Sequence, residues 1–218
     1  MVGGIGTVGY MIPPIITTAA QVGLSTIIGG VVYASNGTGS TFQPGDTIDG
    51  GAGSDTLKLN LAGTLLADYT VAGTEVTGVE RIEVNNFQTA EGFENYVDMS
   101  LYTGYTSFGV ASSNTTGDTY FTNVATIADV IAKAGSGAID VTYTATATAG
   151  TQAQAIEMSG YTGTLTIAGV EAVTVDNSTV KSTATLTATS LQSLTVTGDK
   201  KLTLSSALPC LLYTSDAA

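Results

Sequence analysis

The sequence predicts an all-β protein whose chain winds as a parallel β-solenoid (β-helix or β-roll-like), a column of stacked coils, with one short helical insertion. Only 11% of its residues are charged, and Gly, Thr, Ala and Val dominate, as in chains with many short strands. Apolar and polar residues alternate along several segments, which is typical of half-buried strands. The segment 165–185 also matches the next segment, 186–206, at a spacing that suits one coil of a solenoid. An antiparallel β-sandwich is the alternative, because alternating strands bounded by glycines occur there as well.

Residues 1–40 contain no charged side chain. Their apolar stretch Ile15–Ala34 is long enough to raise the question of a membrane span. Polar residues and glycines interrupt it, however, and no Lys or Arg flanks it to set an orientation. The basic region of a secretory signal peptide is also missing from residues 1–10. We therefore expect a cap or a strand segment in residues 1–40 and no membrane span.

Residues 41–58 contain two nonapeptide units whose acidic and apolar positions are in register. The second unit, residues 50–58, reads G-G-x-G-x-D-x-U-x, in which glycines form a tight turn and one apolar residue points inward. Stacked units of this kind place aspartates in one outer row, where carboxylate and carbonyl oxygens suit Ca²⁺. The alternative is a Gly/Asp-rich turn between two strands that binds no metal. Two pairs of residues occupy equivalent positions of the two units: Asp46 with Asp55, and Ile48 with Leu57.

This pattern resembles the RTX calcium-binding repeat. The longer phrase GDTIDGGAGSDTLKL is similar to secreted bacterial surface-layer and adhesin-like proteins that carry the repeat. The resemblance covers about two nonapeptides, and it implies a secreted, calcium-ordered β-solenoid. The metal ligands that it implies are Asp46 and Asp55, with Asp49 nearby, and the turn carbonyls around Gly50, Gly51 and Gly53.

Half-buried strands are predicted from Thr64 to Gln88, where apolar and polar residues alternate. The phrase at residues 78–86 recurs at 169–177 and, more loosely, at 190–198, with apolar residues at the second, fifth and seventh places. The spacing of the last two copies allows residues 165–185 to be laid over residues 186–206. In that arrangement Val170 lies over Leu191, Val173 over Leu194, and Val175 over Val196.

Residues 87–121 hold eight of the fifteen aromatic residues of the chain. Aromatic rings flanked by Asn and Asp can stack on sugars, since a ring face covers apolar C–H groups, and Tyr102 and Tyr105 are the candidate ligand-binding residues. Interior packing is the alternative. After this region, Ala125–Ala134 is predicted as the one helix, with candidate caps before it and Gly135 after it. The strict Thr alternation of residues 140–148 then predicts a strand with a threonine face, at an edge or along one side of the solenoid.

Residues 209–218, at the end of the chain, break the Thr/Val alternation abruptly. They look like translated adaptor sequence of the kind found at the ends of metagenomic contigs. We therefore expect a non-native tail at 209–218 and assign the solenoid to residues 41–208. The tail contains the single cysteine, Cys210, so an intramolecular disulfide is excluded.

Composition narrows the function. The chain has 6 Lys+Arg against 18 Asp+Glu, a net charge of −12, which argues against nucleic acid as a partner. It contains no histidine, which removes Ser-His-Asp, Cys-His and HExxH chemistry. Paired carboxylates facing one groove remain a candidate acid and base, but solvated strand faces explain them more simply. These carboxylates are Glu80, Glu83, Glu91 and Glu94.

We therefore expect a protein that is not an enzyme, secreted to the cell surface. The first candidate function is a structural module of a calcium-dependent S-layer-like or adhesin protein, with other copies of the layer as partners. The second is a glycan-binding module for cell-surface polysaccharide. The third is a β-helical polysaccharide-degrading enzyme, which the scarcity of basic residues makes the weakest.

Overall fold

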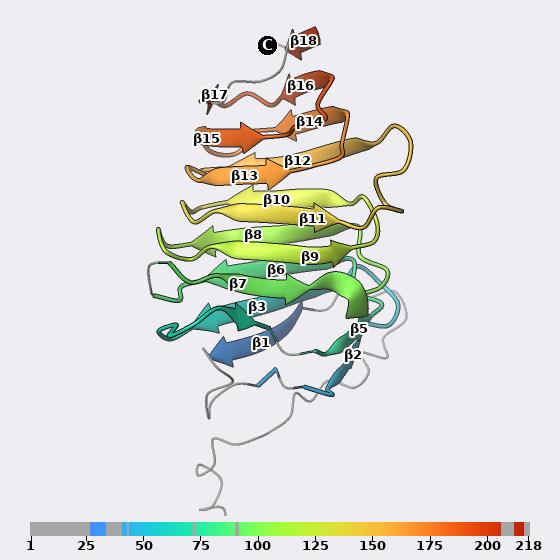
Figure 1. Ribbon diagram of the computed structural model, residues 1–218, viewed down its shortest axis with the longest axis vertical. Helices are drawn as coiled ribbons and strands as arrows, with labels where there is room; N and C mark the ends of the chain where they lie inside the picture. The colour runs from blue at the N-terminus through green and yellow to red at the C-terminus, as the bar shows by residue number, and fades with distance from the viewer. Residues whose placement is uncertain are drawn as a thin grey trace, which may run out of the picture.

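The computed structural model describes residues 27–33, 41–42, 44–71, 73–89, 92–205 and 212–215, without the side chains of 27–33 and 212–215. The chain forms a parallel β-solenoid of about six turns, seen as a column in Figure 1. All pairs of strands in this part of the chain are parallel, and each strand pairs with strands of the preceding and following coils. The predicted fold class is confirmed, and the antiparallel sandwich is excluded.

Nine strands form the first sheet. They are β1 Ile27–Tyr33, β3 Thr56–Ala62, β6 Arg81–Asn86, β8 Ser107–Ser113, β10 Asp129–Lys133, β12 Ala153–Ser159, β14 Ala172–Asp176, β16 Ser193–Thr197 and β18 Leu212–Ser215. They lie side by side in this sequence order, so each coil adds one strand to the sheet.

The second sheet lies in front of the first in Figure 1 and has seven strands. They are β4 Tyr69–Thr70, β7 Asn95–Asp98, β9 Thr119–Val124, β11 Ile139–Tyr143, β13 Thr164–Ile167, β15 Ser182–Thr187 and β17 Leu202–Leu204. A short third sheet pairs β2 Thr47–Asp49 with β5 Glu75–Thr77, and Tyr102 continues it through a bridge to Val76. The early coils therefore have three sides. One 3₁₀ turn, η3 Met99–Leu101, precedes Tyr102.

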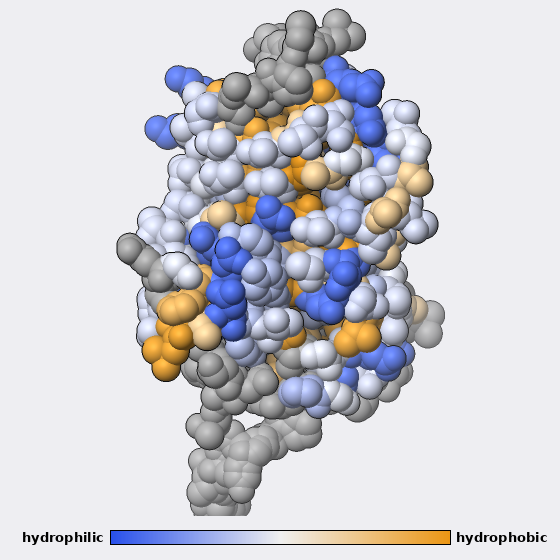
Figure 2. All heavy atoms as spheres, viewed as in Figure 1, coloured by the Kyte–Doolittle hydropathy of each residue, from blue (hydrophilic) through white to orange (hydrophobic). Residues whose placement is uncertain are grey.

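The core fills the space between the sheets, because alternate residues of each strand point inward. In β3, Leu57, Leu59 and Leu61 are buried, and the residues between them are half-buried. Phe108 of the first sheet meets Phe121 of the second edge to face, with ring centroids 5.1 Å apart. Burying one such side chain stabilises the fold by about 1.5–3 kcal/mol. Figure 2 shows that hydrophilic and near-neutral side chains cover most of the outer face of the second sheet.

The predicted register between residues 165–185 and 186–206 is confirmed. Val173 pairs with Leu194, and Val175 with Val196, between β14 and β16. The second sheet obeys the same register in this region, with Leu165 opposite Leu186.

Other coils differ in length. The first described coil is long, because Ile27 pairs with Thr56, whereas a later one is short, because Ala153 pairs with Ala172. The strands of successive coils stack in register while the turns between them vary in length, so no single repeat length describes the whole chain.

The helix predicted at residues 125–134 is wrong, because this segment contains β10. Its Val130 lies between Phe108 of β8 and Ile156 of β12, and Ile131 is fully buried. A short apolar run fits a buried strand as well as a helix, and here the neighbouring strands supply ladder partners on both sides. Ala134, expected to end the helix, has a positive φ of 36° just after the strand.

The structure also describes parts of residues 1–40, 140–148 and 209–218. In residues 1–40, Ile27–Tyr33 form β1 against β3, and the rest lies outside the described residues. In residues 209–218, Leu212–Ser215 pair with β16, and Cys210 lies outside the described residues. The Thr-rich segment 140–148 begins in β11, which lies between β9 and β13 along one side of the column, and then enters a turn. No helix in the described parts of the chain is long and apolar enough to span a membrane.

Buried amides hold successive coils together at their turns. The Asn177 Nδ2 group donates to the carbonyls of Lys200 and Lys201, both at 3.0 Å, and its Oδ1 accepts from the Ser182 hydroxyl. Asn86 is equally buried and donates to the Asp118 carbonyl of the next coil at 3.0 Å. Because a buried amide is costly without partners, these bonds fix how each turn lies on the next.

Candidate functional site

The two nonapeptides of residues 41–58 lie on successive sides of one coil. β2 of the first unit pairs with β5, whereas β3 of the second pairs with β1 and β6. Ile48 and Leu57 are both buried, but in different sheets. The two units therefore do not stack on each other, because the coil here is much longer than a nonapeptide and runs from Thr47 to its partner Glu75.

The predicted aspartates are separated accordingly. Asp46 is half-buried, and its carbonyl accepts from the Glu75 N–H at 3.1 Å. The Asp49 Oδ1 atom accepts from the Gly51 N–H at 2.9 Å, as in a tight turn. Asp55 is 1% exposed, and its N–H donates to Glu80 Oε2 at 2.7 Å. The acid beside Asp55 is thus Glu80 of the next coil.

Sequence reasoning does not assign Glu80 to this turn. The signal that points to it is the register of β3 and β6, in which Thr56 lies opposite Arg81. The residues just before these two strands, Asp55 and Glu80, therefore lie opposite each other at the coil entrance. Two coils, and not two halves of one coil, supply the acidic residues here.

The glycines of the turn allow two backbones to approach closely. A Cβ atom on Gly50 would lie 1.9 Å from the Gly78 carbonyl oxygen, and Gly78 itself has a φ of +60°. A Cβ on Gly78 would lie 2.9 Å from Asp49 Oδ1. Close packing against the next coil therefore explains these glycines. Gly51 and Gly53 also have positive φ angles, of 82° and 138°.

The calcium cage implied by the resemblance needs converging oxygen ligands. Within the part of the chain that the structure describes, no three acidic, histidine or cysteine side chains are grouped closely enough to hold a metal ion. Asp46, Asp49 and Asp55 therefore do not fit such a cage by their side chains. The binding of Ca²⁺ at this turn stays a prediction.

Tyr102 and Tyr105, the predicted sugar-stacking residues, are interior residues. They are 5% and 7% exposed, and the Tyr105 ring packs edge-on against Phe108 with centroids 5.6 Å apart. Burial raises the pKa of both phenols above the usual 10. The interior-packing alternative therefore holds for these two tyrosines. Tyr96 and Tyr120, by contrast, are partly exposed, with neighbouring rings on the second sheet, and Phe87 is 51% exposed.

The glutamates considered as an acid and base pair do not share a groove. Glu80 faces the Gly/Asp turn, and Glu83 lies on the outer face of the first sheet. Glu94 bonds to Tyr96 on the second sheet, and Glu91 lies outside the described residues.

A chain of ion pairs crosses the outer face of the first sheet. Lys58 Nζ lies 3.5 Å from Glu83, and Arg81 Nε lies 2.8 Å from the same carboxylate. The guanidinium then reaches across to Glu157 Oε2 at 2.8 Å, and Lys133 also pairs with Glu157. The network links β3, β6, β10 and β12, so it ties four coils of the column together.

Gly109 makes this span possible. It lies between Glu83 and Ile131 in a cross-strand row that continues to Glu157. A Cβ at Gly109 would lie 2.1 Å from the Ile131 carbonyl oxygen, so only glycine fits there. With no side chain on β8 at this point, Arg81 can reach β12.

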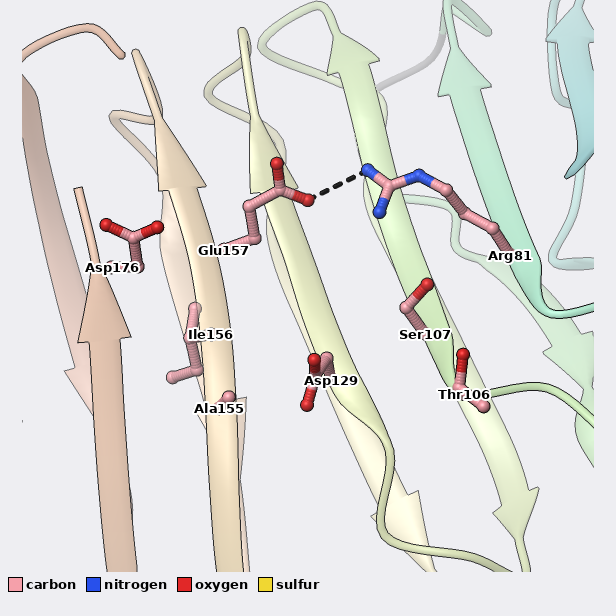
Figure 3. A pocket seen from close by; sticks show the side chains of 8 residues that line it. All are labelled: Arg81, Thr106, Ser107, Asp129, Ala155, Ile156, Glu157 and Asp176. Atoms are coloured by element: carbon pink, nitrogen blue, oxygen red, sulfur yellow. Dashed lines mark hydrogen bonds and ion pairs between the residues drawn. The ribbon is translucent and has the colours of Figure 1, made fainter. Parts of the chain in front are cut away.

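The same face has a shallow open hollow of about 370 Å³ (Figure 3). Arg81 and Glu157 form one wall through their ion pair, and Asp129 and Asp176 lie on its other sides. Burial alone would lower the pKa of Arg81, but the bonds from Glu83 and Glu157 raise it. Burial would likewise raise the pKa of Glu157, but Lys133 and Arg81 hold it below 4.5. Arg81 and Glu157 therefore both stay charged, and their ion pair links coils of the column.

The second sheet has a different outer face, with the tyrosine pair and several carboxylates in place of ion pairs. Comparisons with protein-family models, with curated proteins and with solved structures find no match to this chain. The function is therefore argued from its own residues and geometry.

Proposed function

We propose that this chain is a structural module of a secreted bacterial surface protein, S-layer-like or adhesin-like, that works by self-association with other copies. The observation that supports it most is the ion-pair network from Lys58 to Glu157, which links four strands of one sheet. Single exposed pairs contribute about 0–1 kcal/mol, but a network that links coils resists their separation. A column whose coils are linked by ion pairs is suited to a structural role.

The charge distribution suggests how assembly is controlled. Lys58, Arg81 and Lys133 are used within the network, and Lys200 pairs with its neighbour Asp199. The net charge of −12 therefore leaves acidic groups in excess on the surface. Copies repel one another at low cation concentration, and divalent ions outside the cell reduce that repulsion. This role of Ca²⁺ requires no cage at the Gly/Asp turn.

The experiment is light scattering and electron microscopy of the purified chain at increasing concentration. Three buffers of equal ionic strength are compared: one with a chelator, one with millimolar Ca²⁺ and one with millimolar Mg²⁺. We expect a monomer in chelator and ordered assemblies in Ca²⁺. Assemblies in Mg²⁺ as well would indicate general charge neutralisation, whereas assemblies in Ca²⁺ alone would indicate a specific site. A monomer in all three buffers contradicts the proposal.

A further inference from the structure

The second sheet carries a tyrosine platform, which we define as Tyr96 of β7 and Tyr120 of β9. The two residues are opposite each other in the ladder, and their rings lie 5.3 Å apart with a tilt of 38°. Their strand neighbours Val97 and Phe121 are fully buried, so the tyrosines project from the opposite, outer face. At this centroid distance the two rings overlap in part, so they form one tilted aromatic stack on the outer face.

The platform is held in place from one side. The Tyr96 hydroxyl donates to Glu94, and burial together with the Glu94 carboxylate raises the pKa of the neighbouring Tyr120. The bond to Glu94, with the charges around it, raises the pKa of Tyr96 to about 12. Because Glu94 anchors the Tyr96 hydroxyl, this ring is oriented before any ligand binds, which lowers the entropy lost on binding.

Acidic residues surround the platform. Asp68, Glu94 and Asp118 immediately precede the successive strands β4, β7 and β9. The Glu94 N–H donates to Asp68 Oδ1 at 3.1 Å. Asp140 follows Tyr120 in the same ladder row. Burial raises the pKa of Asp140, and the charge of Glu94 raises it further.

Four of the six cations form ion pairs elsewhere, and Lys181 and Lys201 lie immediately before β15 and β17, further along the column. The ion pairs in this part of the chain involve Lys58, Arg81 and Lys133 on the other sheet, and Lys200 at a turn. Figure 2 accordingly shows strongly hydrophilic groups on the face of the second sheet. The tyrosine platform therefore lies in a negative field that a cationic ligand complements.

We propose that the tyrosine platform binds a protonated amino sugar within a polysaccharide chain. The C–H face of a pyranose ring packs on Tyr96 and Tyr120, and the ammonium group is attracted both by the ring faces and by the nearby carboxylates. Glu94 and Asp140 are placed to accept its hydrogen bonds, since they border the rings on two sides. This inference is independent of self-association and adds a binding activity to the module.

Two other ligand classes fit less well. A neutral sugar uses the rings but leaves the carboxylates without a counter-charge. A lysine side chain of a protein partner satisfies the charge, but its ammonium group needs only one ring face, whereas two neighbouring rings match the breadth of a sugar ring. Anionic polymers are repelled. The amino sugar is the ligand that uses both features.

The experiment is isothermal titration calorimetry on the full chain in chelator, where we expect a monomer. The probes are a β-1,4-linked glucosamine oligomer at a pH that protonates its amines, the N-acetylated oligomer of the same length, and a lysine oligomer of equal charge. We expect the glucosamine oligomer to bind at least about tenfold more tightly than either of the others. This factor corresponds to about 1.4 kcal/mol, within the range of an aromatic–cation contact.

Variants then locate the site. Tyr120→Ala is expected to weaken glucosamine binding about tenfold, and Glu94→Gln to weaken it while leaving the neutral oligomer unaffected. Thr166→Ala, further along the same ladder row, is the matched control and should change nothing. Circular dichroism confirms that each variant is folded. Equal affinity for the neutral oligomer, tighter binding of the lysine oligomer, or unchanged binding by a folded Tyr96→Ala/Tyr120→Ala variant each overturns the proposal.

Discussion

The early coils and the late coils of this column are built differently. Between β2 and β10 the chain has a third side, an aromatic core around Phe108 and most of the ion pairs. From β12 to β17 the coils are shorter, and their core is mostly aliphatic, with residues such as Val175 and Leu186 and one buried ring, Tyr161. The late coils contain little beyond the strands and short turns that stacking requires. In the early coils, longer turns add charged and aromatic groups. The groups that can bind a ligand are therefore concentrated in the irregular half.

The largest expected effect is a loss of stability, which compares the aromatic core of the early coils with the aliphatic core of the late coils. Phe108→Ala removes a ring that contacts both Tyr105 and Phe121, and should reduce the free energy of unfolding by about 3–5 kcal/mol. Val175→Ala, equally buried in the late coils, should cost roughly 2 kcal/mol. Urea denaturation followed by circular dichroism measures both. Equal losses would mean that the aromatic core adds nothing beyond aliphatic stacking.

The next effect concerns the turns of the late coils. Asn177→Ala removes a fully buried amide together with its bonds to the carbonyls of Lys200 and Lys201 and to the Ser182 hydroxyl, and should cost about 2–3 kcal/mol. Asn85→Ala is the control in the early coils, because the Asn85 side chain is only half-buried and donates one bond, to Asn60, and it should cost about 1 kcal/mol or less. The same urea denaturation measures both variants. A larger loss for Asn85→Ala would place the critical amide bonds in the early half.

A smaller effect follows from the ion-pair network. The pKa of Glu157 is lowered from 4.5 in the folded state, so its contribution is complete above that pH and is lost as pH falls through the folded pKa. Since the group is 41% exposed, we expect only about 0.5–1 kcal/mol. Thermal melts of wild type and Glu157→Gln between pH 6 and pH 3 should converge at the acid end. A constant difference over this range contradicts the ion-pair role.

The smallest effect is spectroscopic. The phenol of Tyr96 should ionise near pH 12 in an ultraviolet titration, and Glu94→Gln should bring its pKa down toward 10. Because the pKa of Tyr96 is raised in the folded state, the stabilisation from its bond to Glu94 is present below pH 10 and is lost as pH rises through about 12. Because the chain has ten tyrosines, the difference between wild type and Tyr96→Phe isolates the signal of Tyr96. A Tyr96 that titrates at its ordinary pKa in wild type would remove Glu94 as its anchor.

The regular half is the more predictable part. The stacking of Val173 on Leu194 follows from a repeat with one period and an inward row of aliphatics. The segment at Val130 is mistaken for a helix because a short apolar run has no period that distinguishes the two, and only the neighbouring strands decide it.

The candidate sites are harder to predict. Tyr102 and Tyr96 belong to the same aromatic-rich segment, yet one is buried and the other lies on the surface. Their positions depend on the inward or outward phase of each strand, which shifts wherever a turn changes length. The proximity of Asp55 to Glu80 depends in the same way on coil length, and the nonapeptide pattern contains no information about it.

The parallel register has a consequence for how such a surface changes over time. Equivalent positions of adjacent coils lie about 4.8 Å apart along the axis, a pitch fixed by the backbone. Any outward residue copied from one coil to the next therefore extends a row of evenly spaced groups without altering the fold. At the row of Tyr120, a tyrosine at Asp140 would lengthen the array by one step, and a second one at Thr166 would add the next.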